Sequence, residues 1–202
     1  MDFREKIIEY RKEAPSVASL STKTDLYFLE KYGNRGEGGT FKYNGVLYPG
    51  SIYFFNYNTD SKITDKVKFI DRNPLVLYIS SERVNQELIV KCIDLTITPP
   101  DQRVEILQRL YEKFSGILEN NEKKTFKGES PDPILLNSKD LPQIFKDTGY
   151  KFSFTGFKFK YMEQVKFVDY SDWYKLPYLK YSLVQGMSIN EIYNDYRSKL
   201  KE

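Results

Sequence analysis

The side chains that most often perform acid–base and nucleophilic chemistry are missing from this sequence. The chain of 202 residues contains no histidine and a single cysteine, Cys92. Without histidine, neither a Ser–His or Cys–His nucleophile pair nor the commonest transition-metal ligand is present. One cysteine also excludes an internal disulfide and any multi-cysteine zinc site. The sequence therefore predicts a protein that is not an enzyme, with no catalytic residue, metal site or cofactor, and carboxylate chemistry is the remaining exception.

Carboxylates could support general acid–base or metal-dependent chemistry on their own. Asp65 and Asp71 flank one expected strand, and Asp169 and Asp172 lie close together in the sequence. Neither spacing is diagnostic of a glycosidase or of a nuclease that uses a divalent metal. We expect these four side chains to be solvated at the surface, and Asp94, which closes an apolar run, to cap or pair locally.

A second chemical candidate is the aromatic, lysine-bearing segment 150–161. Its aromatic residues change phase at Gly156, which predicts a β-hairpin with a two-residue Thr155-Gly156 turn. Such a hairpin places six aromatic side chains on one face and sets Lys151 opposite Lys160 on the other. Like charges in opposite positions are destabilising, so an anionic partner such as a phosphate backbone or an acidic surface would relieve them. The aromatic face could then stack bases.

Simpler interpretations of this segment stay open, and we favour them. The aromatic side chains would pack into the core, and the lysines would point to water, where screening weakens their repulsion. One long strand with a bulge at Gly156 is the alternative to the hairpin. The candidate nucleic-acid-binding or partner-binding residues are Arg72, Lys151, Lys158, Lys160 and Lys166.

Arg72 lies in the expected turn Asp71-Arg72-Asn73-Pro74 between two strands. Its planar guanidinium could bind a phosphate. Asp71 and Asn73 are equally good turn formers, and we favour the turn interpretation.

Composition and charge further limit the functional classes to which the protein can belong. The 31 basic and 28 acidic residues give a net charge of +3, too balanced to predict nucleic-acid binding from charge alone. The 17 tyrosines and 14 phenylalanines suit half-buried positions in a small sheet or a subunit interface, but we favour the codon bias of an AT-rich genome as their cause. The charged first residues do not read as a signal peptide, and no apolar run approaches membrane-spanning length.

Hydrophobic periodicity predicts short strands between helical regions. The expected strands are a hairpin over 41–48 with an Asn44-Gly45 turn, then 51–58, 66–70, 75–80 and 87–94. The expected helices are 3–12, one that begins at Thr22 or Thr24 and ends at Gly33, 101–118, a short one within 138–147, and one that begins at Ser188. Residues 119–133 are polar and predict an exposed loop, and residues 169–180 predict irregular structure.

These elements predict an α+β fold: a small curved antiparallel sheet or SH3-like barrel over residues 38–98, with packed helices. These predictions divide the chain into four segments. They are an N-terminal helical segment (1–37), a sheet core with a covering helix (38–118), an exposed loop (119–137), and an aromatic hairpin with helices (138–202).

Three parts of this β region together resemble a pattern found in virion-associated proteins of tailed bacteriophages. They are Pro49-Gly50-Ser51-Ile52-Tyr53-Phe54-Phe55-Asn56-Tyr57, Phe69-Ile70-Asp71-Arg72-Asn73-Pro74-Leu75-Val76-Leu77, and Ile93-Asp94-Leu95 leading to Pro99-Pro100. The family pattern is a Gly-x-x-Tyr-x-Phe-x-Tyr strand, then Tyr/Phe-x-Asp-Arg-x-Pro-Leu-Val, then a Leu-x-x-Leu-Pro-like turn into a helix. The resemblance covers roughly a quarter to a third of the chain. It implies a component of the capsid vertex, neck, tail or baseplate, or a protein bound to packaged DNA ends, and implies no catalytic residues.

A second resemblance is to toxin endoribonucleases with SH3-like barrels. Those proteins share a Pro-Gly-x-Ile strand and an Arg-x-Pro-x-x-Val strand, similar here to Pro49-Gly50-Ser51-Ile52 and Arg72-Asn73-Pro74-Leu75-Val76. The toxins are more compact than this chain, which carries helical additions on both sides. The match therefore implies a small barrel rather than an activity.

The expected function is a non-catalytic structural or assembly role in a tailed phage particle. The expected partners are other virion proteins in an oligomeric assembly without a membrane, located in the virion and, during assembly, in the host cytoplasm. A lack of disulfides fits assembly in a reducing compartment. One alternative is a DNA- or RNA-binding protein, whose binding would fall steeply with salt. The other is a metal-dependent nuclease or hydrolase, whose turnover would depend on a single aspartate.

Overall fold

The computed structural model describes residues 2–33, 46–58, 73–137, 139–146 and 154–179. Several sequence-based expectations lie outside these residues. They are the first arm and the turn of the 41–48 hairpin, the strand 66–70, the helix from Ser188, and the candidate binding residues Arg72 and Lys151. Residues 46–48, the expected second arm of that hairpin, form no strand.

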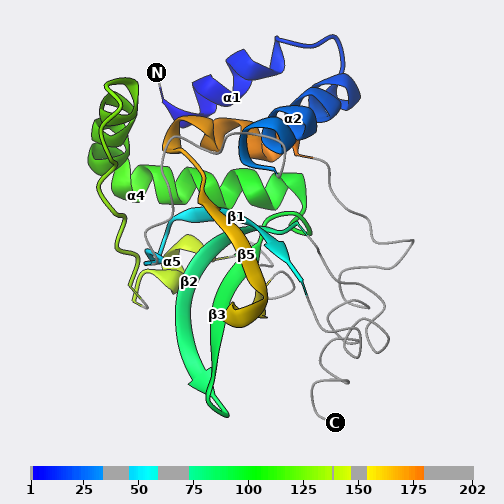
Figure 1. Ribbon diagram of the computed structural model, residues 1–202. Coiled ribbons are helices and arrows are strands. Elements are labelled where there is room, and N and C mark those ends of the chain that lie inside the picture. Colours follow the sequence, from blue (N-terminus) through cyan, green and yellow to red (C-terminus); the bar gives the residue numbers. More distant parts are fainter. Residues whose placement is uncertain (1, 34–45, 59–72, 138, 147–153, 180–202) are drawn as a thin grey trace.

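A five-stranded antiparallel sheet of order β4-β3-β2-β1-β5 forms the centre of the fold (Figure 1). The strands are β1 (Ile52–Tyr57), β2 (Leu75–Val84), β3 (Glu87–Asp94), β4 (Phe154–Lys158) and β5 (Met162–Phe167). Strands β4 and β5 occupy opposite edges, yet only the 3₁₀ turn η2 (Phe159–Tyr161) separates them in the chain. A connection this short requires strong curvature. The described strands do not close into a barrel, so the fold is the α+β class with a small curved sheet, as predicted.

Strand β1 is buried on both faces, as expected for a central strand. Its residues 52–55 and Tyr57 are all buried, and it pairs with β2 on one side and β5 on the other. The ring of Phe157 in β4 lies 5.2 Å from that of Phe55 and 4.8 Å from that of Tyr57, both edge to face. These contacts bring the edge strand β4 against the side chains of β1, which is how the curved sheet encloses its aromatic core.

Strands β2 and β3 form a hairpin that is longer than the sequence indicated. Their pairing extends to Val84 and Glu87, so the connection is the two residues Asn85 and Gln86. Both have positive φ, 49° and 67°, as a type I′ turn requires. Glutamine is a poor residue for that conformation, which explains why residues 81–86 did not read as a tight turn.

Replacement of Gln86 by glycine is therefore expected to stabilise the protein by about 0.5–1 kcal/mol, because glycine adopts positive φ without steric cost. Chemical denaturation of the variant and the wild type measures the difference. An unchanged or lower free energy of unfolding would contradict the turn assignment.

The turn predicted at Thr155-Gly156 is wrong. Strand β4 runs straight through these residues, and Thr155, Gly156 and Phe157 pair in regular register with Cys92, Lys91 and Val90 of β3. The alternative bulge at Gly156 is absent from this register as well.

Close packing between strands explains why position 156 is a glycine. A Cβ atom there would lie 3.0 Å from the Ile89 Cγ2 atom, so the residue reflects close strand packing. Phe154 is exposed and Phe157 is buried, as alternating residues of one strand should be. The expected single face of six aromatic side chains therefore does not form.

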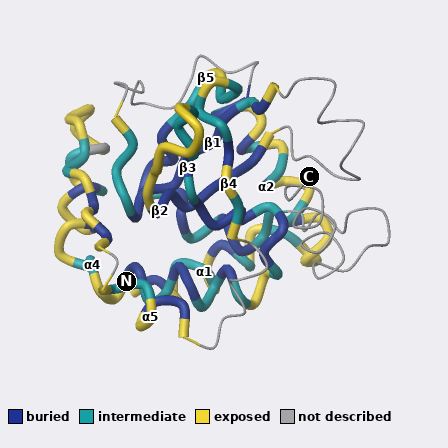
Figure 2. The backbone as a smooth tube through the Cα atoms, turned by 90° about the horizontal axis from the view of Figure 1, so that it is seen from below, coloured by how far each residue is buried: buried dark blue, intermediate teal, exposed yellow. Residues whose placement is uncertain are grey.

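The helices pack at one end of the sheet. They are α1 (Phe3–Arg11), α2 (Val17–Tyr32), α4 (Pro100–Phe126), the short α5 (Leu141–Ile144) and the 3₁₀ helix η3 (Tyr170–Tyr178). Figure 1 shows α4 crossing the end of the sheet, with η3, α2 and α1 beyond it. Helix η3 contacts α1, α2 and α4. One continuous hydrophobic cluster includes residues of the sheet, α1, α2, α4 and η3, and buried segments run through the middle of the molecule in Figure 2.

Two helix boundaries differ from the predictions. Helix α2 begins at Val17 because Ser16 caps it: the Ser16 hydroxyl accepts from the Ser19 N–H, and the Ser19 side chain accepts from the Ser16 N–H. Serine in place of Glu or Gln at the third position concealed this capping box. Helix α4 kinks at Phe114 (φ −114°, ψ 20°) and continues to Phe126, so the expected loop at 119–126 is helical.

Gly50 allows the chain to turn into β1 beside a returning segment. Its φ is +90°, and a Cβ atom there would lie 2.7 Å from Ile134 Cγ2 and 3.0 Å from Leu136 Cβ. Replacement by alanine is expected to destabilise the protein by about 2 kcal/mol, because it combines positive-φ strain with a steric clash. Gly116→Ala is the matched control: it lies in α4 with nothing within 4 Å of its Cβ position, and we expect it to stabilise by about 0.5–1 kcal/mol. Thermal or chemical denaturation of the two variants should move in opposite directions.

Candidate functional site: a buried ion network between α2 and η3

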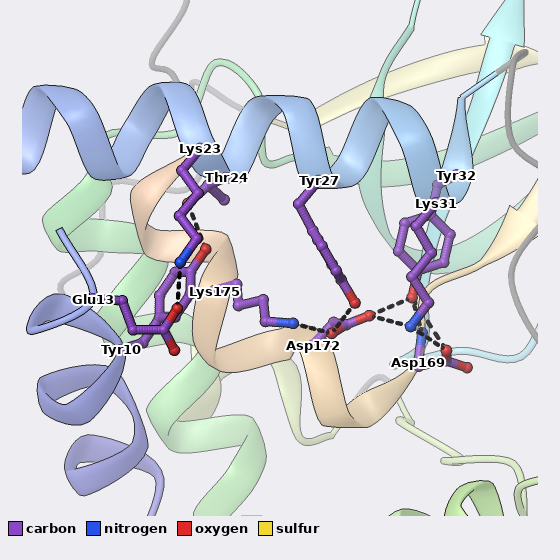
Figure 3. A network of polar contacts seen from close by, with 10 residues as sticks. All are labelled: Tyr10, Glu13, Lys23, Thr24, Tyr27, Lys31, Tyr32, Asp169, Asp172 and Lys175. Atoms are coloured by element: carbon purple, nitrogen blue, oxygen red, sulfur yellow. Dashed lines mark hydrogen bonds and ion pairs between the residues drawn. The ribbon is translucent and has the colours of Figure 1, made fainter.

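The carboxylates of Asp169 and Asp172 lie inside the molecule, at the start of η3. Their residues are only 1% and 2% exposed, so the expectation that they are solvated is wrong. The chain leaves β5 at Phe167, and η3 then turns both side chains toward helix α2 (Figure 3). Burial of two carboxylates is costly unless charges and donors compensate them.

Four side chains donate to the Asp172 carboxylate. Its Oδ1 accepts from the Tyr27 hydroxyl and from Lys175 Nζ, each at 2.8 Å. Its Oδ2 accepts from the Tyr32 hydroxyl at 2.6 Å and from Lys31 Nζ at 2.7 Å. Both oxygens of this buried carboxylate are therefore fully occupied (Figure 3).

Asp169 shares two of these partners. Its Oδ2 lies 2.8 Å from Lys31 Nζ and 3.3 Å from the Tyr32 hydroxyl, which also accepts from the Asp169 backbone N–H at 3.1 Å. Lys175 Nζ stacks over the Tyr27 ring, 3.8 Å from its centroid, a favourable cation–π geometry. The two lysines and two tyrosines thus enclose the acidic pair on both sides.

The opposite charges in this network stabilise one another in their ionised forms. Burial alone would raise the pKa of the Asp172 carboxyl, but Lys175 and Lys31 outweigh it and bring that pKa below the ordinary value of 3.8. Burial likewise opposes the charged lysines, yet the Asp172 carboxylate raises the pKa of both Lys31 and Lys175 above 10.5. The pKa of the Tyr32 hydroxyl is raised by burial and by Asp172, so this group stays protonated as a donor. The pKa values of Asp172, Lys31, Lys175 and Tyr32 are therefore all shifted away from neutral pH.

This arrangement fits a clamp better than a catalytic centre. Tyr27, Lys31 and Tyr32 lie on one side of α2, while Asp172 and Lys175 come from consecutive turns of η3. The spacing Asp169-x-x-Asp172-x-x-Lys175 was visible in the sequence, but nothing local indicated that α2 would cover it. The network fixes the N-terminal helices onto the segment that follows β5.

A smaller set of contacts extends the clamp to α1. The buried Tyr10 hydroxyl lies 3.0 Å from Thr24 Oγ1, and its ring meets Tyr174 edge to face at 5.5 Å. Lys23 and Glu13 form an ion pair of 2.6 Å at the surface above it. Hydrogen bonds, ring contacts and ion pairs therefore join helices α1, α2 and η3 into one layer.

A second buried cation joins α4 to the end of η3. Arg103 is 0% exposed, and it donates to four backbone carbonyls. Its Nε donates to Thr98 O at 2.6 Å, and its terminal nitrogens donate to Leu179 O at 2.6 Å, Thr96 O at 3.2 Å and Leu176 O at 3.3 Å. Sequence reasoning missed this residue because its position on the helix reads as an ordinary polar one.

The predicted binding lysines do not form one site. Lys158 and Lys160 come together, but both pair with Glu87 in β3, and their hydrogen bonds lower the pKa of that carboxyl. Lys166 lies elsewhere and donates to Gly33 O at 3.1 Å. The remaining two candidates, Arg72 and Lys151, lie outside the described residues.

Other candidate groups have ordinary roles. Cys92 is a buried free thiol, as expected, and burial raises its pKa, which makes it unreactive. Asp94 Oδ1 accepts from the Thr96 N–H at 2.9 Å, a local bond that confirms the expected role. Among the described residues, no group of three or more His, Cys, Asp or Glu side chains is placed to hold a metal ion. No helix in the described ranges is long and apolar enough to span a bilayer.

Comparison of the chain with protein-family models, with curated proteins and with solved structures found no match.

Proposed function

We propose that this protein is a non-catalytic structural or assembly component of a tailed bacteriophage particle that acts through contacts with other virion proteins. The observation that carries the proposal is the distribution of charge and apolar surface. The best-placed titratable groups neutralise one another inside the fold, while large apolar side chains project from the helices. Interfaces draw affinity from such exposed apolar groups more than from neutralised charges.

The apolar surface is concentrated on the helical elements. Leu26 and Leu29 lie one turn apart on the outer face of α2, and both are more than half exposed. Ile8 of α1 and Val17 at the start of α2 are exposed to the same degree. A partner protein that covers these side chains would remove their apolar surface from water, which is how interfaces gain affinity.

The phage assignment rests on the resemblance described above. Two of the three resembling segments include the neighbouring strands β1 and β2, and the third joins β3 to α4. The described parts of these segments therefore lie next to one another in the sheet, and the resemblance concerns one region of the fold.

Mass spectrometry of gradient-purified particles tests the proposal. Particles from the phage that encodes this chain should retain the protein after a high-salt wash, at a constant ratio to the major capsid protein. Recovery only in the particle-free fraction of the lysate would contradict a structural role.

The alternative of DNA binding is tested separately, by light scattering of the purified protein at low and high salt with and without a short duplex. We expect no change of mass on addition of DNA. A complex that forms at low salt and dissociates at high salt would replace the structural proposal with a DNA-binding one.

A further inference from the structure

The second half of α4 carries an exposed aromatic side chain beside an open groove. This part of the helix, residues 115–126, follows the kink at Phe114 and is called the α4 arm. Phe126, in the last turn of the arm, is 94% exposed. Figure 1 shows the arm standing away from the sheet on the side where α1 begins, and Figure 2 shows that much of it is exposed. The groove has a volume of about 570 Å³ and is lined by Lys6, Tyr111, Glu119, Glu122, Lys123, Phe126 and Lys127.

The arm is a fixed element, so Phe126 is held outward. The Asn121 side chain is buried and bonds twice to the backbone of Asp132, at 2.8 and 2.6 Å. Lys124 pairs with the Asp132 carboxylate at 2.6 Å. Gly128 (φ +74°) then ends the helix, with the Glu129 N–H donating to Lys124 O at 2.8 Å, as in a Schellman motif.

The side chains that line the groove include both acidic and basic residues. Lys6 pairs with Glu122 within the molecule. Glu119, Lys123 and Lys127 form no ion pair with any other described residue. Glu119 lies one turn before Lys123 and Lys127 one turn after it, so a negative and a positive group flank a central position on the helix.

We propose that this chain forms a two-fold symmetric dimer through the α4 arm, with each Phe126 inserted into the groove of the other copy. A two-fold interface must be self-complementary, because the same patch faces itself. The arm meets this requirement: it carries both the projecting side chain and the groove, and both partners of an ion pair.

Antiparallel arms related by an axis at Lys123 set Lys127 of each copy opposite Glu119 of the other. Lys123 itself falls at the axis, and its side chain is exposed, so its ammonium group can stay hydrated.

The contact is small, since twelve helical residues span roughly 18 Å. We therefore expect a weak dimer with a dissociation constant in roughly the micromolar range. The inference goes beyond the proposed function and concerns the purified chain alone, so it can fail while the particle proposal stands, and the reverse.

Sedimentation velocity over a range of roughly 1 µM to 1 mM measures the association directly. The wild type should pass from monomer to dimer with rising concentration. Phe126→Ala should weaken the dimer at least tenfold without affecting the fold, because this side chain packs against almost nothing in the monomer. The matched control is Leu135→Ala, which removes another exposed apolar side chain that does not line the groove, and it should leave the association unchanged.

Charge reversal tests the two-fold geometry. Lys127→Glu and Glu119→Lys should each weaken the dimer, because each sets like charges opposite one another. The double variant restores both pairs and should recover most of the lost affinity. A wild type that stays monomeric at every concentration, a dimer indifferent to Phe126→Ala, or a double variant without recovery would each overturn the proposal.

Discussion

Replacement of Asp172 by asparagine is expected to lower the free energy of unfolding by about 3 kcal/mol, since it removes the one anion that Lys31 and Lys175 share in the interior. The amide also cannot accept all four hydrogen bonds that the carboxylate accepts from Tyr27, Tyr32 and the lysines. Urea denaturation followed by tryptophan fluorescence measures the loss, because the buried Trp173 lies next to Asp172 in η3.

Glu13→Gln is the matched control for this prediction. It also removes one carboxylate from a lysine ion pair in the helical layer, but that pair lies at the surface with both side chains about half exposed. Surface pairs contribute little, so the control should unfold almost like the wild type. Equal effects of the two substitutions would show that the buried network does not hold α2 to η3.

The pH dependence follows from the same network. Because the folded-state pKa of Asp172 is lowered, its stabilising contribution is fully present above the ordinary carboxyl value of 3.8 and is lost as the pH falls through the lowered value. Because the folded-state pKa values of Lys31 and Lys175 are raised, their contribution is fully present below 10.5 and is lost as the pH rises through the raised values. The difference in stability between wild type and Asp172→Asn should therefore be constant between these limits and shrink in acid.

The second large effect is expected at Arg103. Arg103→Met keeps an unbranched side chain but leaves the carbonyls of Thr96, Thr98, Leu176 and Leu179 without this donor. Buried acceptors that lose a charged donor are expensive, so we expect a loss of about 4 kcal/mol in the free energy of unfolding. The end of η3 should loosen first, because Leu176 and Leu179 are attached to α4 through this side chain. Hydrogen exchange at the backbone amides of η3 reports that loosening.

Arg109→Met on the same helix is the control for Arg103. Arg109 also donates to carbonyls, those of Gln143, Ile144 and Lys146, and it pairs with Glu105, but its side chain is partly exposed. Water can therefore replace the lost donor, and the cost should be less than half of that at Arg103. A comparable cost at both positions would contradict the role assigned to burial.

Local sequence signals predicted β1, β3, the first part of β2, α1 and the first half of α4. They did not predict β5, and they placed a turn where β4 is continuous. Alternation of apolar residues marked β1 and β3 nearly residue for residue, and the stripe beginning at Val104 marked α4. Composition also showed that the chain has no histidine and one cysteine. Composition alone therefore excluded the commonest catalytic groups.

Tertiary structure alone decided which charged groups meet. Lys31 and Asp172 are separated by 141 residues, and Arg103 and Leu176 by 73, distances over which no local pattern carries information. The same holds for Gly156, whose place in a continuous strand depends on Ile89 of the neighbouring strand. The short-range periodicity of apolar residues indicates which face of a helix or strand is buried. Which buried faces then pack against one another depends on the free energy of the whole packed core. The buried clamp and the exposed Phe126 were both products of that packing.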